Sequence, residues 1–384
     1  MKKLNEKIAS WCNDIEDSAM QQINNLASLP FLFKHVAVMP DCHAGYGMPI
    51  GGVAAFKNCV VPNAVGVDIG CGMIAAKMDL RAEELSKDVL RKWMGEIRKI
   101  VPVGFNHFKN PVEDKLMPSV NYFKGGYIWN EEYDSAKYQM GTLGGGNHFI
   151  EIQKDSEGFV WVMIHSGSRN LGLKVAKYYN NLAIELNAKW HSSVPKNFEL
   201  AFLPEGTEYF RDYIREMEYC LEFAKSSRLM MLNNVLSVCP IEKKYPKFIH
   251  DIHHNYASLE NHYGENVWVH RKGATRVRSG EIGIIPGSQG SCSYIVKGLG
   301  NPLSFMSCSH GAGRKMSRTK AKENLNLEEE IKKMEEKGII HGIRNEKDLD
   351  EAAGAYKDID SVMDSQKDLI EIVTKLEPMA VVKG

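Results

Sequence analysis

The sequence lacks an excess of charge of either sign, which narrows the classes of protein that fit it. Its 384 residues carry 48 Lys and Arg against 48 Asp and Glu, so the formal net charge is zero. Global charge therefore gives no indication of nucleic-acid binding, and any such surface has to come from local clusters. Hydrophobic residues at 43% and charged residues at 25% are typical of a soluble globular protein with a sizeable core.

Long hydrophobic runs are also missing. No stretch reaches the roughly 18–20 apolar residues that a membrane-spanning helix needs. Residues 1–20, MKKLNEKIASWCNDIEDSAM, begin with lysines but continue with acidic and polar residues instead of the apolar segment of a secretory signal. These absences predict a cytoplasmic protein with no membrane partner.

The eight cysteines form no C-x-x-C pair, which argues against a zinc ribbon or a disulfide scaffold. We expect reduced thiols, most of them buried as small apolar residues. The chain also lacks a Pro/Gly/Ser-rich linker and an internal repeat of fixed period. A single domain over 1–384 is therefore favoured over two.

Alternation and helical spacing of apolar residues predict a mixed α/β fold. Short strands are expected in 31–80 (HVAVM, GGVAAF, NAVGVDIG, MIAAKM), in 141–165 as two strands joined by KDSEG, and in 249–310 (IHDIHHNYA, ENVWVHRKGATRV, GEIGIIPGS, SYIVKGL, SFMSCSH). Helices are expected in 81–101, through most of 171–236, and in 325–338. The last of these reads as an exposed helix with opposite charges four residues apart.

Five histidines lie in glycine-rich or small-residue segments at the ends of predicted strands, where loops commonly carry function. They are His43, His148, His165, His254 and His310. A single histidine is more often a packed residue than a ligand, so the neighbouring residues decide its role.

The segment VGVDIGCGM at 65–73 places Asp68 three residues before Cys71, with glycines on both sides of the thiol. This spacing lets the backbone curl so that both side chains reach one cation. A hard carboxylate oxygen and a soft thiolate suit a borderline metal such as Mn²⁺, Zn²⁺ or Fe²⁺. A strand that ends in a turn with a buried cysteine is the alternative.

Two further glycine-rich segments carry polar groups at strand ends. In GTLGGGNHFIEI (141–152), alternation points His148 to one face of the strand and Asn147 and Glu151 to the other. In VMIHSGSRNLG (162–172), hydroxyls and Arg169 follow the strand and suit an oxyanion or phosphate. Serine-based nucleophilic catalysis is disfavoured there, because G-x-S-x-G and an orienting acid are missing.

The remaining candidates combine histidine with basic residues. In DIHHNYASLENHYG (251–264) the adjacent His253 and His254 face opposite ways, and composition leaves open which one points into a shared site. The segments VHRKGATRVR (269–278) and SCSHGAGRKMSRTKAK (307–322) form local basic clusters that suit phosphate-rich partners, with a solvated surface as the alternative. Within the second segment, His310 reads equally as a packed residue, a metal ligand or a nucleophile.

Eight segments, taken together and in order, resemble the motifs of the RtcB-type RNA ligases. They are PDCHAGYGMPIGGVAAF, GVDIGCGM, GGGNHFIEI, HSGSRNLG, HHNYA, HRKGATR, IIPGSQG and SCSHGAGRKMSR. The motifs run from about residue 39 to 318, and the terminal Lys383-Gly384 matches the family's end. The resemblance therefore covers nearly the whole chain.

The resemblance implies one large domain with central β-sheets around a dinuclear metal cleft and with peripheral helices. It implies an enzyme that uses GTP and two Mn²⁺ ions to join an RNA 2′,3′-cyclic phosphate or 3′-phosphate to a 5′-hydroxyl, in tRNA splicing or RNA repair. In the family a histidine forms a covalent phosphoramidate with GMP, which then passes to the RNA 3′-phosphate. The physiological RNA and the need for an activating protein stay open. A metal-dependent phosphohydrolase acting on RNA 3′ ends and a non-catalytic RNA-end sensor are the alternatives.

Motif matching also implies roles for individual residues. His310 resembles the family's nucleophile. The residues that resemble its metal ligands are Asp68, Cys71, His148, His165 and His254, the last being the histidine directly before Asn. Residues that resemble the nucleotide-binding set are Asn147, Glu151, Ser288, Gly311, Gly313, Arg314, Tyr356 and Lys383. Asp41 resembles an acid that lies near the metal. Gln289 and Asn170 depart from the residues usual in the family, Met and Gly, which bears on nucleotide or RNA-end preference and not on the class of reaction.

Overall fold

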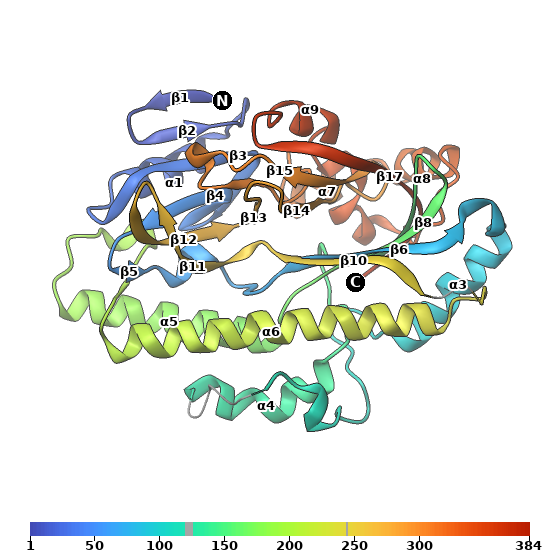
Figure 1. The fold of residues 1–384 in the computed structure, drawn as a ribbon, viewed down its shortest axis with the longest axis horizontal. Helices are drawn as coiled ribbons and strands as arrows, with labels where there is room; N and C mark the ends of the chain where they lie inside the picture. Colours follow the sequence, from blue (N-terminus) through green and yellow to red (C-terminus); the bar gives the residue numbers. More distant parts are fainter. Residues whose placement is uncertain (120–125, 243–244) are drawn as a thin grey trace.

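The computed structural model describes residues 1–119, 126–242 and 245–384 as a mixed α/β fold built on two large β-sheets (Figure 1). The predicted fold class is confirmed. The first sheet has the order β1 (Lys2–Asn5), β2 (Ile8–Ser10), β3 (Leu32–Tyr46), β4 (Met48–Phe56), β12 (Glu265–Lys272), β11 (Asn255–His262). The second has the order β10 (Pro246–His253), β6 (Gly72–Arg81), β8 (Phe159–Ser166), β7 (Phe149–Asp155), β17 (Ile370–Lys383), β15 (Ser293–Gly298), β14 (Ile282–Ile285).

Two short strand pairs and several helices complete the described fold. The pairs are β13 (Ala274–Arg276) with β16 (Ser307–Ser309), and β5 (Cys59–Val60) with β9 (Leu203–Pro204). The helices are α1 (Asp17–Ala27), α2 (Pro62–Val65), α3 (Lys87–Ile100), α4 (Tyr127–Gln139), α5 (Arg169–Lys189), α6 (Glu208–Ser237), α7 (Arg318–Asn324), α8 (Leu327–Glu336) and α9 (Ile359–Asp364). Within the described ranges, no helix is both long enough and apolar enough to cross a membrane.

Helix α6 joins the hydrophobic cores that lie under the sheets. Its N-terminus is capped by Thr207, whose hydroxyl accepts the backbone N–H of Phe210, and no Gly or Pro interrupts its 30 residues. Residues of its first half pack with α5, while Met231 and Val235 pack with the second sheet and α3. In Figure 1, α5 and α6 run side by side beneath the strands, and α4 lies beyond them.

Between β10 and β11 the chain passes from the second sheet to the first through a single residue. Strand β10 of the second sheet ends at His253, and β11 of the first sheet begins at Asn255, so His254 lies at the junction. Its backbone N–H donates to the carbonyl oxygen of Cys71 at 2.9 Å, and its own carbonyl accepts from Ala274 at 3.2 Å. The predicted continuous strand IHDIHHNYA is therefore wrong, since the chain changes sheet within it.

Arg228 of α6 fixes three of these strands from below, and its side chain is fully buried. The guanidinium makes two hydrogen bonds of 2.7 Å to the carboxylate of Asp251 on β10. Its Nη1 atom also donates to the carbonyl oxygens of Gly70 and Ser166, at 3.0 and 2.9 Å. One side chain thus connects the loop before β6, the end of β8 and the end of β10.

The predicted strand NAVGVDIG is also wrong. Pro62 occupies the first turn of α2, where its fixed φ and missing N–H favour a helix, and the short helix ends at Gly66 with φ +93°. The segment from Gly66 to Cys71 is then a turn that leads into β6. The apolar character of the stretch reflects burial in the core and not extension.

The other predicted elements are found with shifted bounds, and several elements had not been predicted. The hairpin around KDSEG and the helices α3, α5 and α6 are confirmed. The charged helix in 325–338 is α8, but Glu330 and Met334 are buried, so one of its faces packs against the protein. Helices α1 and α4 and strand β17 had not been predicted. All eight cysteines are free thiols, and all but Cys292 are buried, as expected.

Replacing Arg228 with Met should lower the free energy of unfolding by about 3–5 kcal/mol, because it leaves the Asp251 carboxylate buried without its partner. Urea denaturation followed by circular dichroism measures this change. Arg215→Met, an exposed site on the same helix, is the matched control and should stay within about 0.5 kcal/mol of the unmodified protein. A loss below about 1 kcal/mol for Arg228→Met would contradict the structural role given to this residue.

Candidate active site

The second sheet brings four of the predicted metal ligands together at the ends of neighbouring strands. Its strands β10, β6, β8 and β7 are neighbours and antiparallel, and Gly72 pairs with both His253 and Ser166. The residues just before β6 and β7 and at the ends of β8 and β10 therefore lie together. These residues are Cys71, His148, His165 and His254.

The ligand atoms form a continuous series of short separations. The Nε2 atom of His148 is 3.1 Å from Asp68 Oδ2 and 3.4 Å from Cys71 Sγ. On the other side, the sulfur is 3.2 Å from His165 Nε2, which is 3.3 Å from His254 Nε2. The thiol thus lies in the middle of the series. All five predicted ligands are brought together.

The orientation of the imidazole rings fits a bound cation. Backbone carbonyl oxygens of Leu143 and Asn147 lie 2.9 and 3.0 Å from the Nδ1 atoms of His148 and His165, so each Nδ1 carries the proton and donates it. The Nε2 atom of His165 then presents its lone pair toward the cysteine sulfur, whereas His148 Nε2 also contacts the Asp68 carboxylate. Such an outer hydrogen bond that fixes the tautomer is a regular feature of metal-bound histidine.

Burial sets the protonation of the ligand groups. It holds the pKa values of His165 and His254 well below the usual range, so both rings are neutral. Burial and the nearby Asp68 raise the pKa of the Cys71 thiol, so a cation is what would make it a thiolate. For Asp68, burial opposes ionisation, but the hydrogen bond and charge of His148 hold its pKa well below the usual range.

His310 lies beside this cluster but is bonded differently. Its ring is 4.8 Å from the ring of His254, in an edge-on arrangement. The Oδ2 atom of Asp41 is 2.6 Å from His310 Nδ1 and 3.1 Å from its backbone nitrogen. Asp41 is fully buried, and its carboxylate accepts both N–H groups, which leaves the lone pair of His310 on Nε2. The predicted metal-proximal acid is thus the residue that orients His310.

Two glycines make room for this histidine. Gly273 has φ +62°, and a Cβ there would lie 3.0 Å from the His310 ring. Gly313 has φ +73°, and a Cβ there would overlap the carbonyl oxygen of Asp41. Both positions require glycine, because a side chain would be strained and would displace the Asp41–His310 pair.

A pocket of about 530 Å³ opens in front of His310. His165 and His310 form part of its wall, and so does His43, whose Nδ1 atom is 2.9 Å from the Asp41 carbonyl oxygen. Every residue predicted to bind the nucleotide also lines this pocket: Asn147, Glu151, Ser288, Gly311, Gly313, Arg314, Tyr356 and Lys383. Residues scattered over most of the chain are therefore gathered around one cavity.

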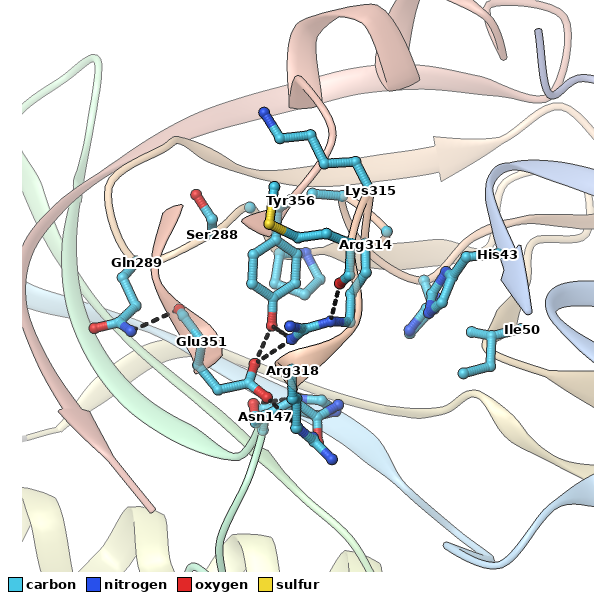
Figure 2. A pocket seen from close by; sticks show the side chains of 18 of the residues that line it. His43, Ile50, Asn147, Ser288, Gln289, Arg314, Lys315, Arg318, Glu351 and Tyr356 are labelled. Carbon is cyan, nitrogen blue, oxygen red and sulfur yellow. Dashed lines mark hydrogen bonds and ion pairs between the residues drawn. The ribbon is translucent and has the colours of Figure 1, made fainter. Parts of the chain in front are cut away.

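Glu351, which the sequence reasoning missed, organises one side of the pocket (Figure 2). Its buried carboxylate pairs with Arg314 at 3.2 Å and Arg318 at 2.8 Å, and it accepts the hydroxyl of Tyr356. Burial opposes its ionisation, but the charge of Lys383 and these partners lower its pKa. The acidic stretch around it looks like an ordinary surface run, so no sequence signal identified it.

Glu151 and Lys383 face the same cavity and affect each other's charge. Burial raises the pKa of Glu151 to about 8, although Gln153 and Lys383 counteract the rise. Burial lowers the pKa of Lys383, while Glu351 and Glu151 oppose that change. The Glu151 carboxyl group is thus largely protonated at neutral pH.

Arg314 is occupied by protein groups in this structure. Besides Glu351, its guanidinium donates to the carbonyl oxygens of Met316 and Asp350, at 3.1 and 2.6 Å. Its contact with a phosphate stays a prediction, and such a contact would require one of these bonds to be exchanged.

The two departures from the family pattern have structural partners. Gln289 lines the pocket and donates to the carbonyl oxygen of Glu351 at 2.8 Å. Asn170 lies in the first turn of α5 and donates to the Glu132 carboxylate at 3.0 Å. Gln289 therefore touches the candidate nucleotide site, whereas Asn170 ties α5 to α4.

Comparison with known proteins agrees with this arrangement. The family model described as tRNA-splicing ligase RtcB matches residues 22–132 and 117–384. The RNA-splicing ligase RtcB of Escherichia coli (strain K12) is 40% identical, with 99% of this chain and 98% of that protein covered.

More distant relatives match over similar lengths. The tRNA-splicing ligase RtcB of Nanoarchaeum equitans (strain Kin4-M) is 33% identical, covering 96% of this chain and 92% of that protein. The RNA-splicing ligase RtcB homolog 1 of Entamoeba dispar (strain ATCC PRA-260 / SAW760) is also 33% identical, over 96% of this chain and 82% of that protein. On the extent of these matches, the chain belongs to the RtcB family.

Proposed function

We propose that this protein is an RNA ligase that joins a 3′-phosphate or 2′,3′-cyclic phosphate end to a 5′-hydroxyl end, in tRNA splicing or RNA repair. The observation that carries the proposal is the Asp41–His310 pair, which presents a free Nε2 atom to a pocket beside a cluster of five metal-ligating groups. Relatives at 33–40% identity are named RNA-splicing or tRNA-splicing ligases. The cofactors are GTP and two Mn²⁺ ions, the compartment is the cytoplasm, and residues 1–384 act as one domain.

In the first step, His310 attacks GTP. The Nε2 lone pair forms a bond to the α-phosphorus, and the bond from that phosphorus to the bridging oxygen breaks, so that pyrophosphate leaves. Asp41 keeps the remaining proton on Nδ1 and stabilises the positive charge that develops on the ring. For a 2′,3′-cyclic phosphate, water first adds to the phosphorus and the bond to O2′ breaks, which leaves a 3′-phosphate and a 2′-hydroxyl. The GMP group then passes from His310 to the RNA 3′-phosphate, and the 5′-hydroxyl displaces GMP to form the phosphodiester.

The ligand cluster has the donor set for two divalent cations. Asp68, Cys71, His148, His165 and His254 would hold them. When bound, the cations supply the positive charge that phosphoryl transfer needs on the phosphate oxygens. The neutral imidazoles of His165 and His254 leave that charge undiminished.

The far side of the pocket suits the nucleotide. A buried carboxyl group at Glu151 can accept N–H groups of a guanine edge once it is ionised, and Lys383 beside it supports that ionisation. Tyr356 and Arg314 lie against each other and are held by Glu351, so they form a fixed wall along the cavity. Asn147 also lines the cavity, and its carbonyl oxygen is 3.0 Å from His165 Nδ1, so a phosphate contact is expected there.

His310→Ala should abolish covalent labelling of the protein by α-³²P-GTP in the presence of Mn²⁺, because the only nucleophile assigned to the step is removed. Denaturing gel electrophoresis detects the label. His250→Ala, a half-buried histidine bonded to the carbonyl oxygen of Ile282, is the control and should be labelled normally. Persistent labelling of His310→Ala would refute the assignment, and release of phosphate from RNA 3′ ends without GTP would favour a phosphohydrolase.

Cys71→Ser should weaken metal binding by about tenfold or more, since even changes behind the ligands commonly have effects of that size. With Co²⁺ as the probe, the unmodified protein should show a sulfur-to-metal charge-transfer absorption that the variant lacks. Cys292→Ser, at a half-buried thiol outside the cluster, should retain the band. The metal site would have to be reassigned if the band survived in Cys71→Ser.

The affinity for GTP should rise with pH through a group with a pKa near 8. Because burial raises the pKa of Glu151 to about 8, this carboxyl group carries a proton at neutral pH that must leave before the carboxylate accepts guanine N–H groups. Below pH 8 the dissociation constant should therefore fall by about tenfold per pH unit, and it should level off above. Equilibrium binding to the unlabelled His310→Ala protein measures this dependence.

Glu151→Gln is the control for the pH experiment. The amide of this variant cannot become a carboxylate, so the variant should bind GTP weakly. Since the amide does not titrate, the part of the pH dependence that comes from Glu151 should disappear. An unmodified protein whose affinity is flat between pH 6 and 9, or falls as pH rises, would exclude the role given to Glu151.

A further inference from the structure

Tyr46 is an exposed aromatic residue at the mouth of the pocket that contains His310. It ends β3 at the tight turn into β4, its relative exposure is 71%, and it lines the cavity together with His310 and His43. Among the described residues, no ring stacks on it and no side chain bonds its hydroxyl. Nothing within the described protein therefore uses the face of this ring.

In contrast to the free side chain, the backbone around Tyr46 is held at four successive residues. The carboxylate of Glu16 accepts the N–H of Ala44 at 2.6 Å. Gln22 bonds both the N–H and the carbonyl oxygen of Gly45, at 3.1 and 2.6 Å. The N–H of Gly47 donates to Glu199 at 3.2 Å, completing a set of contacts that come from separate parts of the chain.

The fourth contact is made by a buried lysine. The ammonium group of Lys272 donates to the carbonyl oxygen of Tyr46 at 2.6 Å and to that of Asn63 at 3.1 Å. Only 7% of the residue is exposed, and burial lowers its pKa to about 7. Burying a lysine against carbonyl groups costs free energy. Its two hydrogen bonds offset part of that cost and hold the turn in place.

The location of Tyr46 separates it from the nucleotide wall. Figure 2 shows His43 and Ile50, which flank the same hairpin, on the opposite side of the pocket from Gln289 and Glu351. His310 lies near Ile50, since a Cβ built on Gly273 would contact both side chains. A nucleotide held by the Glu351 side therefore leaves the Tyr46 side open to the second substrate.

We propose that Tyr46 is a stacking platform for a nucleobase at the RNA end that approaches His310. This inference rests on the proposed function, since it names a substrate contact of the same site. A rigid backbone that presents an unpartnered ring is how proteins bind single-stranded nucleic acid without reading its sequence, because every base has a π-face. Because the turn is already ordered, RNA binding does not have to pay the conformational entropy of immobilising it.

The test compares Tyr46→Leu, which removes the ring, with Tyr46→Phe, which keeps it. Tyr245→Leu is the matched control, since Tyr245 is 87% exposed and lies just before β10, at the end of that strand opposite His253. Three reactions are measured with the full-length protein. They are labelling by GTP alone, transfer of GMP to an oligonucleotide with a 3′-phosphate and no 5′-hydroxyl acceptor, and joining of two oligonucleotides.

We expect Tyr46→Leu to raise the KM for RNA by about tenfold or more while GTP labelling keeps its normal rate. Tyr46→Phe should recover most of that affinity, and Tyr245→Leu should match the unmodified protein. If the KM for RNA is already higher in GMP transfer, the base that stacks on Tyr46 belongs to the 3′-phosphate strand. If the KM is higher only in the joining reaction, that base belongs to the 5′-hydroxyl strand.

An abasic nucleotide at the RNA end provides an independent check. It should weaken RNA binding by the unmodified protein to the level of Tyr46→Leu, and it should cause no further loss in that variant. An unchanged KM for RNA in Tyr46→Leu, or a loss of GTP labelling in place of RNA affinity, would overturn this inference alone. Failure of the unmodified protein to take label from GTP or to join RNA would instead overturn the proposed function.

Discussion

The candidate metal site depends on the hydrogen bonds of one buried guanidinium. Arg228 joins Asp251 to the carbonyl oxygens of Gly70 and Ser166, and each of these residues lies within three positions of a predicted ligand. Without Arg228, the loop before β6 and the ends of β8 and β10 would be held near the candidate metal site mainly by the backbone hydrogen bonds between strands. Because a buried arginine needs its donors satisfied, the same contacts that stabilise the core also fix where the ligand atoms point.

The site divides its histidines between two tasks by what their Nδ1 atoms contact. The candidate ligands His148 and His165 donate to neutral backbone carbonyls, whereas His310 donates to the carboxylate of Asp41. A ring that donates its Nδ1 proton to a carbonyl oxygen can stay neutral, and the lone pair on its Nε2 atom can then bind a cation. A carboxylate partner stabilises a ring that becomes positively charged, as a nucleophile does when it forms a phosphoramidate. Neighbouring rings of the same chemical type are thereby suited to different steps.

Short-range patterns in the sequence predicted the alternating strands and the long helices, and the resemblance to the RtcB-type ligases implied the dispersed residues that line one pocket. They could not predict features that arise from distant packing. Glu351 lies in an acidic run that looks like surface, and it becomes central only because Arg314 and Arg318 fold against it. Arg228 looks like any helical arginine until three strands converge on it. The error at α2 was avoidable, since Pro62 is a recognisable start of a helix.

The central claim is that the buried Asp, Cys and His groups hold metal ions next to an imidazole that carries GMP. Anomalous X-ray scattering at the manganese edge, from crystals grown with Mn²⁺ and GTP, tests this most directly. The account predicts manganese peaks on both sides of Cys71 Sγ, in contact with the three ligand histidines, and continuous density from His310 Nε2 to a nucleotide phosphorus. Manganese bound elsewhere, with no peak at Cys71, or a nucleotide joined to a residue other than His310, would contradict it.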